Sequence, residues 1–374
     1  MDSRRKFCFV LPAFSAMPKD AKGGSEIQAC LIGQELLRRG WEVHYIRENN
    51  QMVGQEERIQ GIIVHSLPQR HTKLKWANTR RLSRLMKKIK AEVWYCRATG
   101  SYVFPVSLNA KKIGGKVIWA CSSDRFLAKN SVKEWKKESL LRRTASLIDR
   151  FLLKRSMGKV DLIILQNHGQ KRLLAENWGL KGEVIYNSHP IFPLKKAERE
   201  PLILWIGRLQ PWKHPEGFTQ LVRGLKEKPY KFLALGRKVE DFGYDEDFLK
   251  MEKEVANFSY LGERSREDVF QLLEKAKVLV NTSRVEGFSN TFIEAWLHGV
   301  PVVTLNVDPD ELIEKNSLGS VSRNSDKLIK DVELLMENEE LWRQTSRRCR
   351  KFAEENFNII DKVNDLEGLI ERLE

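Results

Sequence analysis

The sequence predicts an α/β protein built from two doubly wound domains, and three observations support this fold class. Short runs rich in Val, Ile and aromatic residues recur along the 374-residue chain, separated by longer segments with helical periodicity. Most of these runs are apolar throughout, which is typical of parallel strands covered by helices on both faces. A single hydrophobic core seldom grows beyond about 250–300 residues, so this length favours two domains.

Twelve segments are predicted to be buried strands. They span residues 6–12, 42–47, 62–67, 92–96, 117–121, 161–166 and 183–186 in the first half, and 202–207, 231–236, 258–261, 278–281 and 302–305 in the second. Helices fit between them; residues 26–39 form one that ends at Gly40, a plausible C′ glycine. The final stretch, residues 341–373, is predicted to be helical with a break near residues 356–358.

A change in composition marks the expected domain boundary. Residues 187–200 (NSHPIFPLKKAERE) contain two prolines and no periodic pattern, so we expect a linker there. The predicted domains are an N-terminal one at residues 1–190 and a C-terminal one at residues 191–355. We expect residues 356–374 to form a helix that packs back on the N-terminal domain.

Charge is divided unevenly between the two halves. Residues 1–195 contain 37 Lys and Arg against 16 Asp and Glu, a net charge of +21, whereas the remainder carries −6. This asymmetry favours an anionic partner for the N-terminal half, such as a membrane surface, a phosphorylated acceptor or nucleic acid. A surface that serves only solubility is the alternative.

Two basic segments lie in that half. Residues 70–90 contain nine Lys and Arg and no acid, and we expect this segment to contact an acceptor or the membrane. The cations singled out there are Arg80, Arg81, Arg84, Lys87 and Lys88. In the second segment, residues 129–155, an apolar stripe lies opposite a basic one, and we interpret it as a helix packed on the sheet. The predicted apolar stripe comprises Leu141, Ala145, Ile148 and Leu152.

The cysteines and the apolar segments indicate the cellular compartment of the protein. The five cysteines are scattered and lack C-x-x-C spacing, which disfavours a disulfide framework or a zinc site and favours a reducing cytoplasm. The apolar run near the start is short for a signal peptide and is interrupted by Pro12, so we interpret it as the first strand. No stretch approaches the roughly 18 apolar residues of a membrane span. We expect a cytoplasmic protein whose membrane contact, if any, is peripheral, at the inner face of the cytoplasmic membrane.

The most informative stretch is residues 278–303, VLVNTSRVEGFSNTFIEAWLHGVPVV. A buried strand leads through a loop to a glycine turn at Gly287, and a helix then begins. Ser289, Asn290 and Thr291 are good N-cap residues. Backbone N–H groups and the helix dipole make such a helix start an anion site of the kind that phosphates occupy.

Charged residues surround this helix start. Glu286 precedes the turn and Glu294 lies about one turn into the helix, so both can lie at the carboxyl end of the sheet, where open α/β sheets bind ligands. Two carboxylates beside a phosphate site favour a ligand with hydrogen-bond donors, such as sugar hydroxyls. Arg208 and Lys213, in LILWIGRLQPWK, follow another strand and suit a diphosphate. In the first half, Gly24 precedes a helix and lets a ligand approach the backbone, although Gly-Gly there is often only a turn.

Together these residues resemble the family-4 retaining glycosyltransferases of the GT-B fold. The resemblance rests on GGSEIQACLIGQELLRRGWEV, VDLIILQNHGQKRLL, the IGRLQPWK block, FSYLGERSREDVFQLLEKAKVLVNTS and the E-x₇-E signature from Glu286 to Glu294, followed by GVPVV. It covers most of the chain, with residues 50–118 and 245–255 matched least. It implies two Rossmann-like domains facing a central cleft, the first binding the acceptor and the second the nucleotide sugar.

The resemblance also implies a role for each candidate residue. Arg208 and Lys213 would hold the donor diphosphate and stabilise its leaving charge, and Glu286 would contact the sugar. Glu294 would contact the ribose, and Gly24 would close over the donor from the other domain. The other implied donor-binding residues are Gly287, Phe288, Ser289, Asn290 and Thr291 beside the sugar, and Gly236, Arg237, Lys238 and Leu261 beside the base. Family members are described as transferring sugars with retention and without a metal, so no metal or other cofactor is expected.

One position departs from the family pattern. Many relatives carry a His after the fifth N-terminal strand, whereas this chain has Ala-Cys-Ser-Ser-Asp at residues 120–124. A hydroxyl of Ser122 or Ser123 can replace one hydrogen bond to the donor sugar but not the reach of an imidazole, and Asp124 is a catalytic candidate near the sugar or acceptor. The identity of the donor therefore stays open. Acidic triplets at residues 245–247 and 308–310 imitate the D-x-D metal motif of another glycosyltransferase fold but lack its strand context.

The predicted function is transfer of a hexose or similar sugar from a nucleoside-diphosphate sugar to a membrane-associated or phosphorylated glycan or lipid, in polysaccharide or lipopolysaccharide synthesis. A Rossmann-type oxidoreductase is disfavoured because neither half shows G-x-G-x-x-G after its first strand. A non-enzymatic membrane- or nucleic-acid-binding protein would fit the +21 half, but base-reading motifs are absent and no nucleic-acid partner is expected. A phosphorylase or synthase of the same fold would be expected to be longer.

Overall fold

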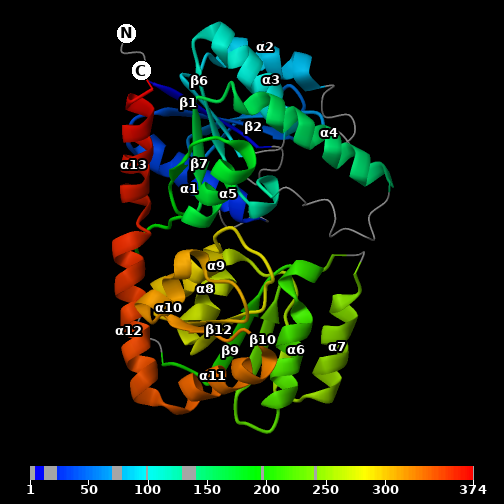
Figure 1. Ribbon diagram of the computed structural model, residues 1–374, viewed down its shortest axis with the longest axis vertical. Helices are drawn as coiled ribbons and strands as arrows, with labels where there is room; N and C mark the ends of the chain where they lie inside the picture. Colours follow the sequence, from blue (N-terminus) through cyan, green and yellow to red (C-terminus); the bar gives the residue numbers. More distant parts are fainter. Residues whose placement is uncertain are drawn as a thin grey trace. The chain divides into compact units, whose positions relative to one another are not determined.

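The computed structural model describes residues 5–11, 23–69, 78–97, 100–128, 140–194, 198–239 and 242–373, apart from the side chains at positions 125, 140–143, 145 and 146. The chain divides into two compact units (Figure 1). The first unit comprises Met1–Tyr186 together with Ile359–Glu374, and the second comprises Asn187–Asn358.

The first unit is built on an eight-stranded sheet with the order β3-β4-β2-β1-β5-β6-β7-β8. The strands are β1 (Lys6–Val10), β2 (Glu42–Glu48), β3 (Glu56–Ile59), β4 (Ile62–Leu67), β5 (Val93–Cys96), β6 (Lys116–Ala120), β7 (Leu162–Leu165) and β8 (Glu183–Val184). All neighbours pair in parallel except β3 and β4. The strand order reverses between β1 and β5, so the loops that follow these two strands diverge at the carboxyl edge.

β3 was not predicted, and it makes the expectation of a wholly parallel sheet wrong at this edge. Its sequence, EERI, alternates exposed and half-buried residues and lacks the apolar run that marks the other strands. It pairs with β4 in an antiparallel hairpin. Gln60 and Gly61 form the turn with φ of 49° and 86°, as a type I′ turn requires.

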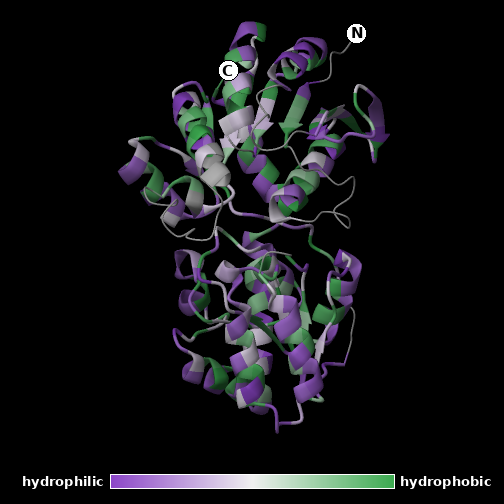
Figure 2. Cartoon of the chain, turned by 90° about the vertical axis from the view of Figure 1, so that its right-hand side faces the viewer, coloured by the Kyte–Doolittle hydropathy of each residue, from purple (hydrophilic) through white to green (hydrophobic). Residues whose placement is uncertain are grey.

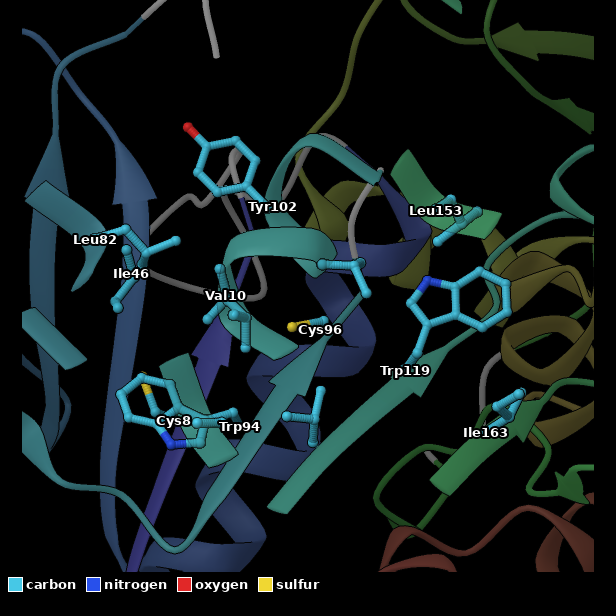
Figure 3. Close-up of a cluster of buried hydrophobic side chains, with 14 of the residues drawn as sticks. Cys8, Val10, Ile46, Leu82, Trp94, Cys96, Tyr102, Trp119, Leu153 and Ile163 are labelled. Carbon is cyan, nitrogen blue, oxygen red and sulfur yellow. The ribbon is translucent and has the colours of Figure 1, made fainter. Parts of the chain in front are cut away.

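Helices cover both faces of this sheet. They are α1 (Gly24–Arg38), α2 (Thr79–Ile89), α3 (Gly100–Ala110), α4 (Leu140–Met157), α5 (His168–Trp178) and α13 (Ile359–Glu371). On one face, Trp94 and Trp119 of the strands belong to a buried cluster with Tyr102 of α3 and Leu153 of α4 (Figure 3). On the other face, α1 and α13 share a core with residues such as Phe9.

The end of the chain returns to the first unit. Phe357 and Asn358 separate α12 (Glu339–Asn356) from α13, within the stretch where the sequence predicted a break. Trp41 Nε1 donates to Glu367 Oε1 at 2.7 Å, and Arg39 Nη1 donates to Glu367 Oε2 at 2.7 Å. The apolar side of α13 lies in the core beside α1. The helix is therefore anchored to the first unit by both polar and apolar contacts.

The second unit contains a parallel six-stranded sheet with the order β11-β10-β9-β12-β13-β14. The strands are β9 (Leu202–Ile206), β10 (Lys231–Leu235), β11 (Phe258–Tyr260), β12 (Val278–Asn281), β13 (Val302–Thr304) and β14 (Gly319–Val321). The helices are α6 (Pro215–Gly224), α7 (Tyr244–Glu254), α8 (Arg266–Lys275), α9 (Asn290–Leu297), α10 (Leu312–Asn316), α11 (Ser325–Glu337) and α12. β14 was not predicted, because its three residues, GSV, are too few to form a pattern. The strand order reverses between β9 and β12.

The first residues of the predicted linker are packed rather than extended through solvent. The division between units falls after Tyr186 and again after Asn358, whereas the sequence placed the boundaries at 190 and 355. Asn187 and His189 are buried, and His189 N donates to Phe357 O at 2.9 Å. This contact makes them part of the second unit.

α4 turns a different face to the sheet from the one that the sequence predicted. Ile148, which was assigned to the packed face, is 60% exposed, whereas Leu153 and Met157 are buried. Apolar and polar residues are mixed along the helices of both units (Figure 2), so periodicity alone leaves the orientation open. Asp149 settles it by accepting a hydrogen bond from Ser101 N at 2.8 Å, which turns that side of α4 toward α3. The side chains of Leu141 and Ala145 and the positions of residues 129–139 lie outside the described residues.

Candidate functional site

The candidate site of the second unit lies at the carboxyl ends of β9 and β12, where the strand order reverses. Open α/β sheets bind ligands at such a point because the neighbouring loops diverge and leave room. Arg208 and Lys213 lie in the loop after β9, and Glu286 lies in the loop after β12. The predicted cations and carboxylate therefore come from adjacent loops at one edge.

Lys213 and Glu286 are in direct contact. Lys213 Nζ bonds Glu286 Oε1, and Ser283 Oγ donates to the same oxygen at 2.7 Å. The two charged side chains are only 20% and 14% exposed. The backbone is fixed as well, since Thr282 Oγ1 donates to Lys213 O at 2.8 Å and accepts from Trp205 Nε1 at 2.9 Å. The edge thus presents an ammonium group, suited to phosphate, beside a carboxylate, suited to a hydroxyl donor.

Arg208 follows β9 and is exposed. The chain around it is held by Leu209 N, which donates to Arg237 O at 3.1 Å. A Cβ atom on Gly236 would lie 1.6 Å from Gly207 O, so the loops after β9 and β10 approach so closely that only glycine fits at position 236. This close packing fixes the backbone of the loop that carries Arg208.

The N-cap residue of α9 does not cap the helix with its side chain. Ser289 occupies the N-cap position, as the sequence predicted, but its side chain makes no cap hydrogen bond. Ser289 Oγ instead bonds Thr291 Oγ1 at 2.8 Å. Asn290 is held from the other side, where its Oδ1 accepts from Asn187 Nδ2 at 2.9 Å. Because the N-cap side chain does not cap the helix, the helix dipole at this end can attract an anion.

The turn before α9 is rigidly packed. Gly287 and Phe288 are both buried. The ring of Phe288 lies 5.3 Å from that of Phe357, which stacks on Trp296 at 5.8 Å. Asn187 Nδ2 also donates to Phe288 O at 2.9 Å. The backbone between Glu286 and α9 is therefore fixed without a ligand.

Glu294 is buried one turn into α9, at 5% exposure. Arg266 Nη2 lies 3.1 Å from its Oε1 and His189 Nε2 lies 3.8 Å away, but this oxygen makes no well-aligned hydrogen bond. Burial raises the pKa of Glu294, and Arg266 opposes that effect. Burial and the charge of Arg266 hold the pKa of His189 well below its usual value, so its imidazole is neutral. A ligand hydroxyl that donated to Glu294 would stabilise the ionised carboxylate.

The residues predicted for the base lie at the ends of β10 and β11. Arg237 is exposed and follows Gly236 at the end of β10. Lys238 is tied to α7, since its Nζ lies 2.6 Å from Asp245 Oδ2. Leu261 is half-buried after β11. Leu261 and Arg237 can border a base here, whereas Lys238 is engaged by an acidic residue that the sequence analysis did not connect to it.

The donor-binding and catalytic residues predicted in the first half of the chain follow strands of the first sheet. Gly24 begins α1, and the N-cap residue before it, Gly23, has no side chain to cap the helix. Ser122 and Asp124 follow β6 and are half-buried. Gln170 Nε2 of α5 donates to Asp124 Oδ1 at 2.8 Å. Asp124 is thus held in place by a neighbouring helix.

Two family models match the chain. "Glycosyl transferases group 1" matches residues 190–355, and "Glycosyl transferase 4-like" matches residues 24–167. The chain belongs to the family-4-like glycosyltransferases. The first match contains both loops that bring Lys213 and Glu286 together.

Relatives of this glycosyltransferase include proteins from several bacteria. An uncharacterized glycosyltransferase of Haemophilus influenzae is 23% identical over 374 residues, covering 96% of this chain and 99% of its own. An uncharacterized 41.2 kDa protein in the cps region of Klebsiella pneumoniae is 27% identical and covers 69% of this chain and 70% of its own. A Campylobacter jejuni GalNAc-α-(1→4)-GalNAc-α-(1→3)-diNAcBac-PP-undecaprenol α-1,4-N-acetyl-D-galactosaminyltransferase is 30% identical over 45% of this chain and 50% of its own.

Solved glycosyltransferase structures share the fold over the full length of the chain. A sucrose-phosphate synthase from Thermosynechococcus elongatus has a TM-score of 0.76 at 14% identity and covers 99% of each chain. Anabaena HepE in complex with UDP and glucose has a TM-score of 0.74 at 16% identity and covers 99% of this chain and 100% of its own. The predicted GT-B fold class, with its two Rossmann-like domains, is confirmed. The synthase matches end to end, so the length argument against a synthase is wrong.

α2 of this glycosyltransferase exposes the predicted basic residues. Exposed cations along it are Arg80, Arg81, Arg84, Lys87 and Lys88. Lys88 Nζ lies 3.1 Å from Glu56 Oε2. Residues 70–77, the first part of the basic segment, lie outside the described residues. Within the described ranges, no helix is both long and apolar enough to cross a bilayer.

The sequence analysis missed three residues at the carboxyl edges of the two sheets or beside the predicted site residues. His189 and Arg266 surround Glu294, but one lay in the predicted linker and the other at an ordinary helix start. Arg97 directly follows β5 and is only 7% exposed. Burial raises the pKa of the Cys121 thiol to about 12. The charge of Asp124 adds to this rise, and the charge of Arg97 opposes it. An arginine directly after a buried strand was the available signal, the same signal that identified Arg208.

Proposed function

We propose that this glycosyltransferase transfers a hexose or similar sugar, with retention of configuration, from a nucleoside-diphosphate sugar to a membrane-associated or phosphorylated glycan or lipid. The observation that carries the proposal is the contact of Lys213 with Glu286, in the loop that leads into α9. A sugar diphosphate offers phosphate oxygens and hydroxyls next to one another. This edge offers an ammonium group, a carboxylate in contact with it and the positive end of a helix dipole.

The proposed donor geometry assigns one chemical task to each group. Lys213 and Arg208 bind the diphosphate and stabilise the negative charge that develops as the glycosidic bond breaks. Phosphate oxygens compete with Glu286 for the ammonium group, which frees that carboxylate to accept from sugar hydroxyls. Glu294, whose Oε1 lacks an aligned hydrogen bond, accepts from the ribose. The solved structure of Anabaena HepE in complex with UDP-glucose supports this class of donor.

The acceptor proposal rests on charge and on relatives. The exposed cations of α2 and the +21 charge of residues 1–195 suit an anionic acceptor. The acceptor named for the Campylobacter relative is a glycan on undecaprenyl diphosphate, and the Klebsiella relative lies in a cps region. We therefore place the reaction in the synthesis of a cell-surface polysaccharide or lipopolysaccharide, at the cytoplasmic face of the membrane.

A metal is not part of the proposed mechanism. Among the described residues, no group of three or more His, Cys, Asp or Glu is arranged to hold a metal ion. Positive charge at the diphosphate comes from Arg208 and Lys213 instead. Turnover that is unchanged by EDTA would support this assignment, and turnover that requires a divalent cation would contradict it.

A panel of UDP-, GDP- and ADP-sugars, screened by thermal shift, tests the donor. Binding stabilises the native state by RT ln(1 + [L]/Kd), so a ligand at about 100 times its Kd adds roughly 2.7 kcal/mol. We expect one base and one sugar to give the largest shift. NMR of the product then reads the anomeric configuration. Inversion would overturn the retaining assignment, and tight NAD binding without any nucleotide-sugar binding would overturn the donor class.

A further inference from the structure

The outer face of α4 carries a cluster of exposed apolar side chains. Leu147, Ile148 and Phe151 are 54%, 60% and 67% exposed, and the spacing i, i+1 and i+4 places them on one side of the helix. Other large exposed hydrophobic residues in the described part of the chain do not form such a group on one helix; they are Val53, Ile191, Leu194, Leu249, Val285, Leu334 and Ile360. A contiguous apolar cluster on a surface marks an interaction site, whereas single residues do not.

The opposite face of α4 fixes this exposure. Leu153 and Met157 are buried in the core of the first unit. Ser101 N donates to Asp149 Oδ1 at 2.8 Å. At Gly100 the backbones meet, because a Cβ atom there would lie 2.1 Å from Asp149 O. Rotating α4 to hide the apolar cluster would break all of these contacts, so the cluster is a fixed surface feature of this unit.

Cations border the cluster. Lys154 and Arg155 are exposed at the end of α4. Helices α2, α3 and α4 share one buried core, on a single face of the sheet, so the exposed cations of α2 belong to the same helical layer (Figure 1). An apolar cluster flanked by Lys and Arg is typical of a helix that lies in the interface of an anionic bilayer.

We propose that α4 is a membrane-contact helix: Leu147, Ile148 and Phe151 insert among the lipids, while Lys154 and Arg155 contact anionic headgroups. A second copy of the chain fits less well. A stable dimer usually buries at least about 1,200 Å² in total, more than three side chains supply. Two copies of a surface this basic would also repel each other. A bilayer needs only shallow insertion and supplies the opposite charge.

This inference deepens the membrane-associated acceptor of the proposed function, but its test is independent of it. Vesicle binding is measured without a nucleotide sugar, so failure of donor binding leaves the helix assignment intact. Loss of vesicle binding likewise leaves the donor assignment intact.

The test compares vesicles of phosphatidylglycerol and phosphatidylcholine with vesicles of phosphatidylcholine alone, by co-sedimentation. The triple variant Leu147→Ser, Ile148→Ser and Phe151→Ser should bind the anionic vesicles at least about tenfold more weakly than the native chain. Its melting temperature should not fall, because the replaced side chains are already exposed. The matched control is Leu334→Ser, at a residue 52% exposed on α11, which should bind like the native chain.

A fluorescent probe reports insertion directly. The five native cysteines are all buried, so a new surface cysteine can be labelled selectively. An NBD label on Phe151→Cys should shift to shorter wavelength with anionic vesicles. The same label on Glu227→Cys, at a side chain 88% exposed in the second unit, should not.

Two results would overturn the proposal. One is equal vesicle binding by the triple variant and the native chain, with no spectral shift at position 151. The other is conversion of a dimer to a monomer by the triple variant with vesicle binding unchanged, which would assign the cluster to a second copy of the chain.

Discussion

Replacing Lys213 by Ala tests the central contact of the site. The proposed function gives this ammonium group the leaving diphosphate as its main partner, and Glu286 as its partner in the free enzyme. The variant should therefore lose far more transition-state stabilisation than folding stability. Glu286→Gln tests the other side of the contact, because it keeps the shape and the hydrogen bond from Ser283 but removes the charge.

The structure predicts a small loss of folding stability and a much larger loss of turnover. The side chains are 20% and 14% exposed, so the pair is partly screened by solvent, and its loss should cost about 1 kcal/mol of folding stability. A fixed charge aimed at a developing anion typically contributes about 2.7–4 kcal/mol to the barrier, which corresponds to a 10²–10³-fold loss of turnover. Chemical denaturation measures the first quantity. Nucleotide release from the donor identified by thermal shift measures the second, and calorimetry with UDP or GDP measures diphosphate affinity.

Lys277→Ala is the matched control. Its side chain is 15% exposed and its Nζ lies 2.7 Å from Glu339 Oε2, so it also belongs to a partly buried ion pair of the second unit. It precedes β12, whereas the site lies after β12, so turnover should stay near normal. The reasoning fails if Lys213→Ala retains near-normal turnover and diphosphate affinity, or if Lys277→Ala lowers turnover as much.

Three further outcomes follow from the structure. Gly236→Ala should leave the protein unfolded or destabilised by several kcal/mol, as seen by expression level and thermal melting, because its Cβ would lie 1.6 Å from Gly207 O. Ser289→Ala should cost less stability than Asn167→Ala, because Ser289 makes no cap bond and loses only its bond to Thr291 Oγ1, whereas Asn167 caps α5 and its loss should cost about 1 kcal/mol; denaturant midpoints compare them. Burial lowers the pKa of His298 to about 4. The neutral imidazole therefore contributes its full stability above about pH 6.5, and this contribution is lost as the pH falls toward 4. Thermal melts should show a loss of stability of up to roughly 3 kcal/mol over this range, and the loss should be smaller in His298→Gln.

The sequence predicted the buried strands well because their signal is strong and local. A parallel strand covered on both faces must be apolar throughout, and such runs stand out beside helical segments. β3 and β14 were missed for opposite reasons. β3 lies at an edge and keeps charged residues, and β14 is only three residues long. Their positions depend on pairing with the neighbouring strands β4 and β13.

The orientation of α4 shows a limit of periodicity. Its apolar residues occur on more than one side, so several faces could pack on the sheet. Ser101 and Asp149 choose among them through a hydrogen bond between residues 48 positions apart, which no local window contains. The same holds for Glu294, whose neighbours His189 and Arg266 come from distant segments.

Site residues were predictable where the fold itself places them. Residues in the loop after a parallel strand lie at the carboxyl edge, so Arg208, Lys213 and Glu286 could be grouped before the contact of Lys213 with Glu286 was seen. Arg97 also follows a parallel strand but was not predicted as a site residue. Its strand, β5, lies in the first half of the chain, whereas the sequence analysis assigned the diphosphate to the second half. Its burial makes the point stronger: a charge taken out of water must be stabilised by what surrounds it, and Asp124, of opposite charge, acts on the same thiol, Cys121. Position relative to the sheet is therefore better evidence for a site than charge alone, and by this criterion Arg97 is as strong a candidate as Arg208.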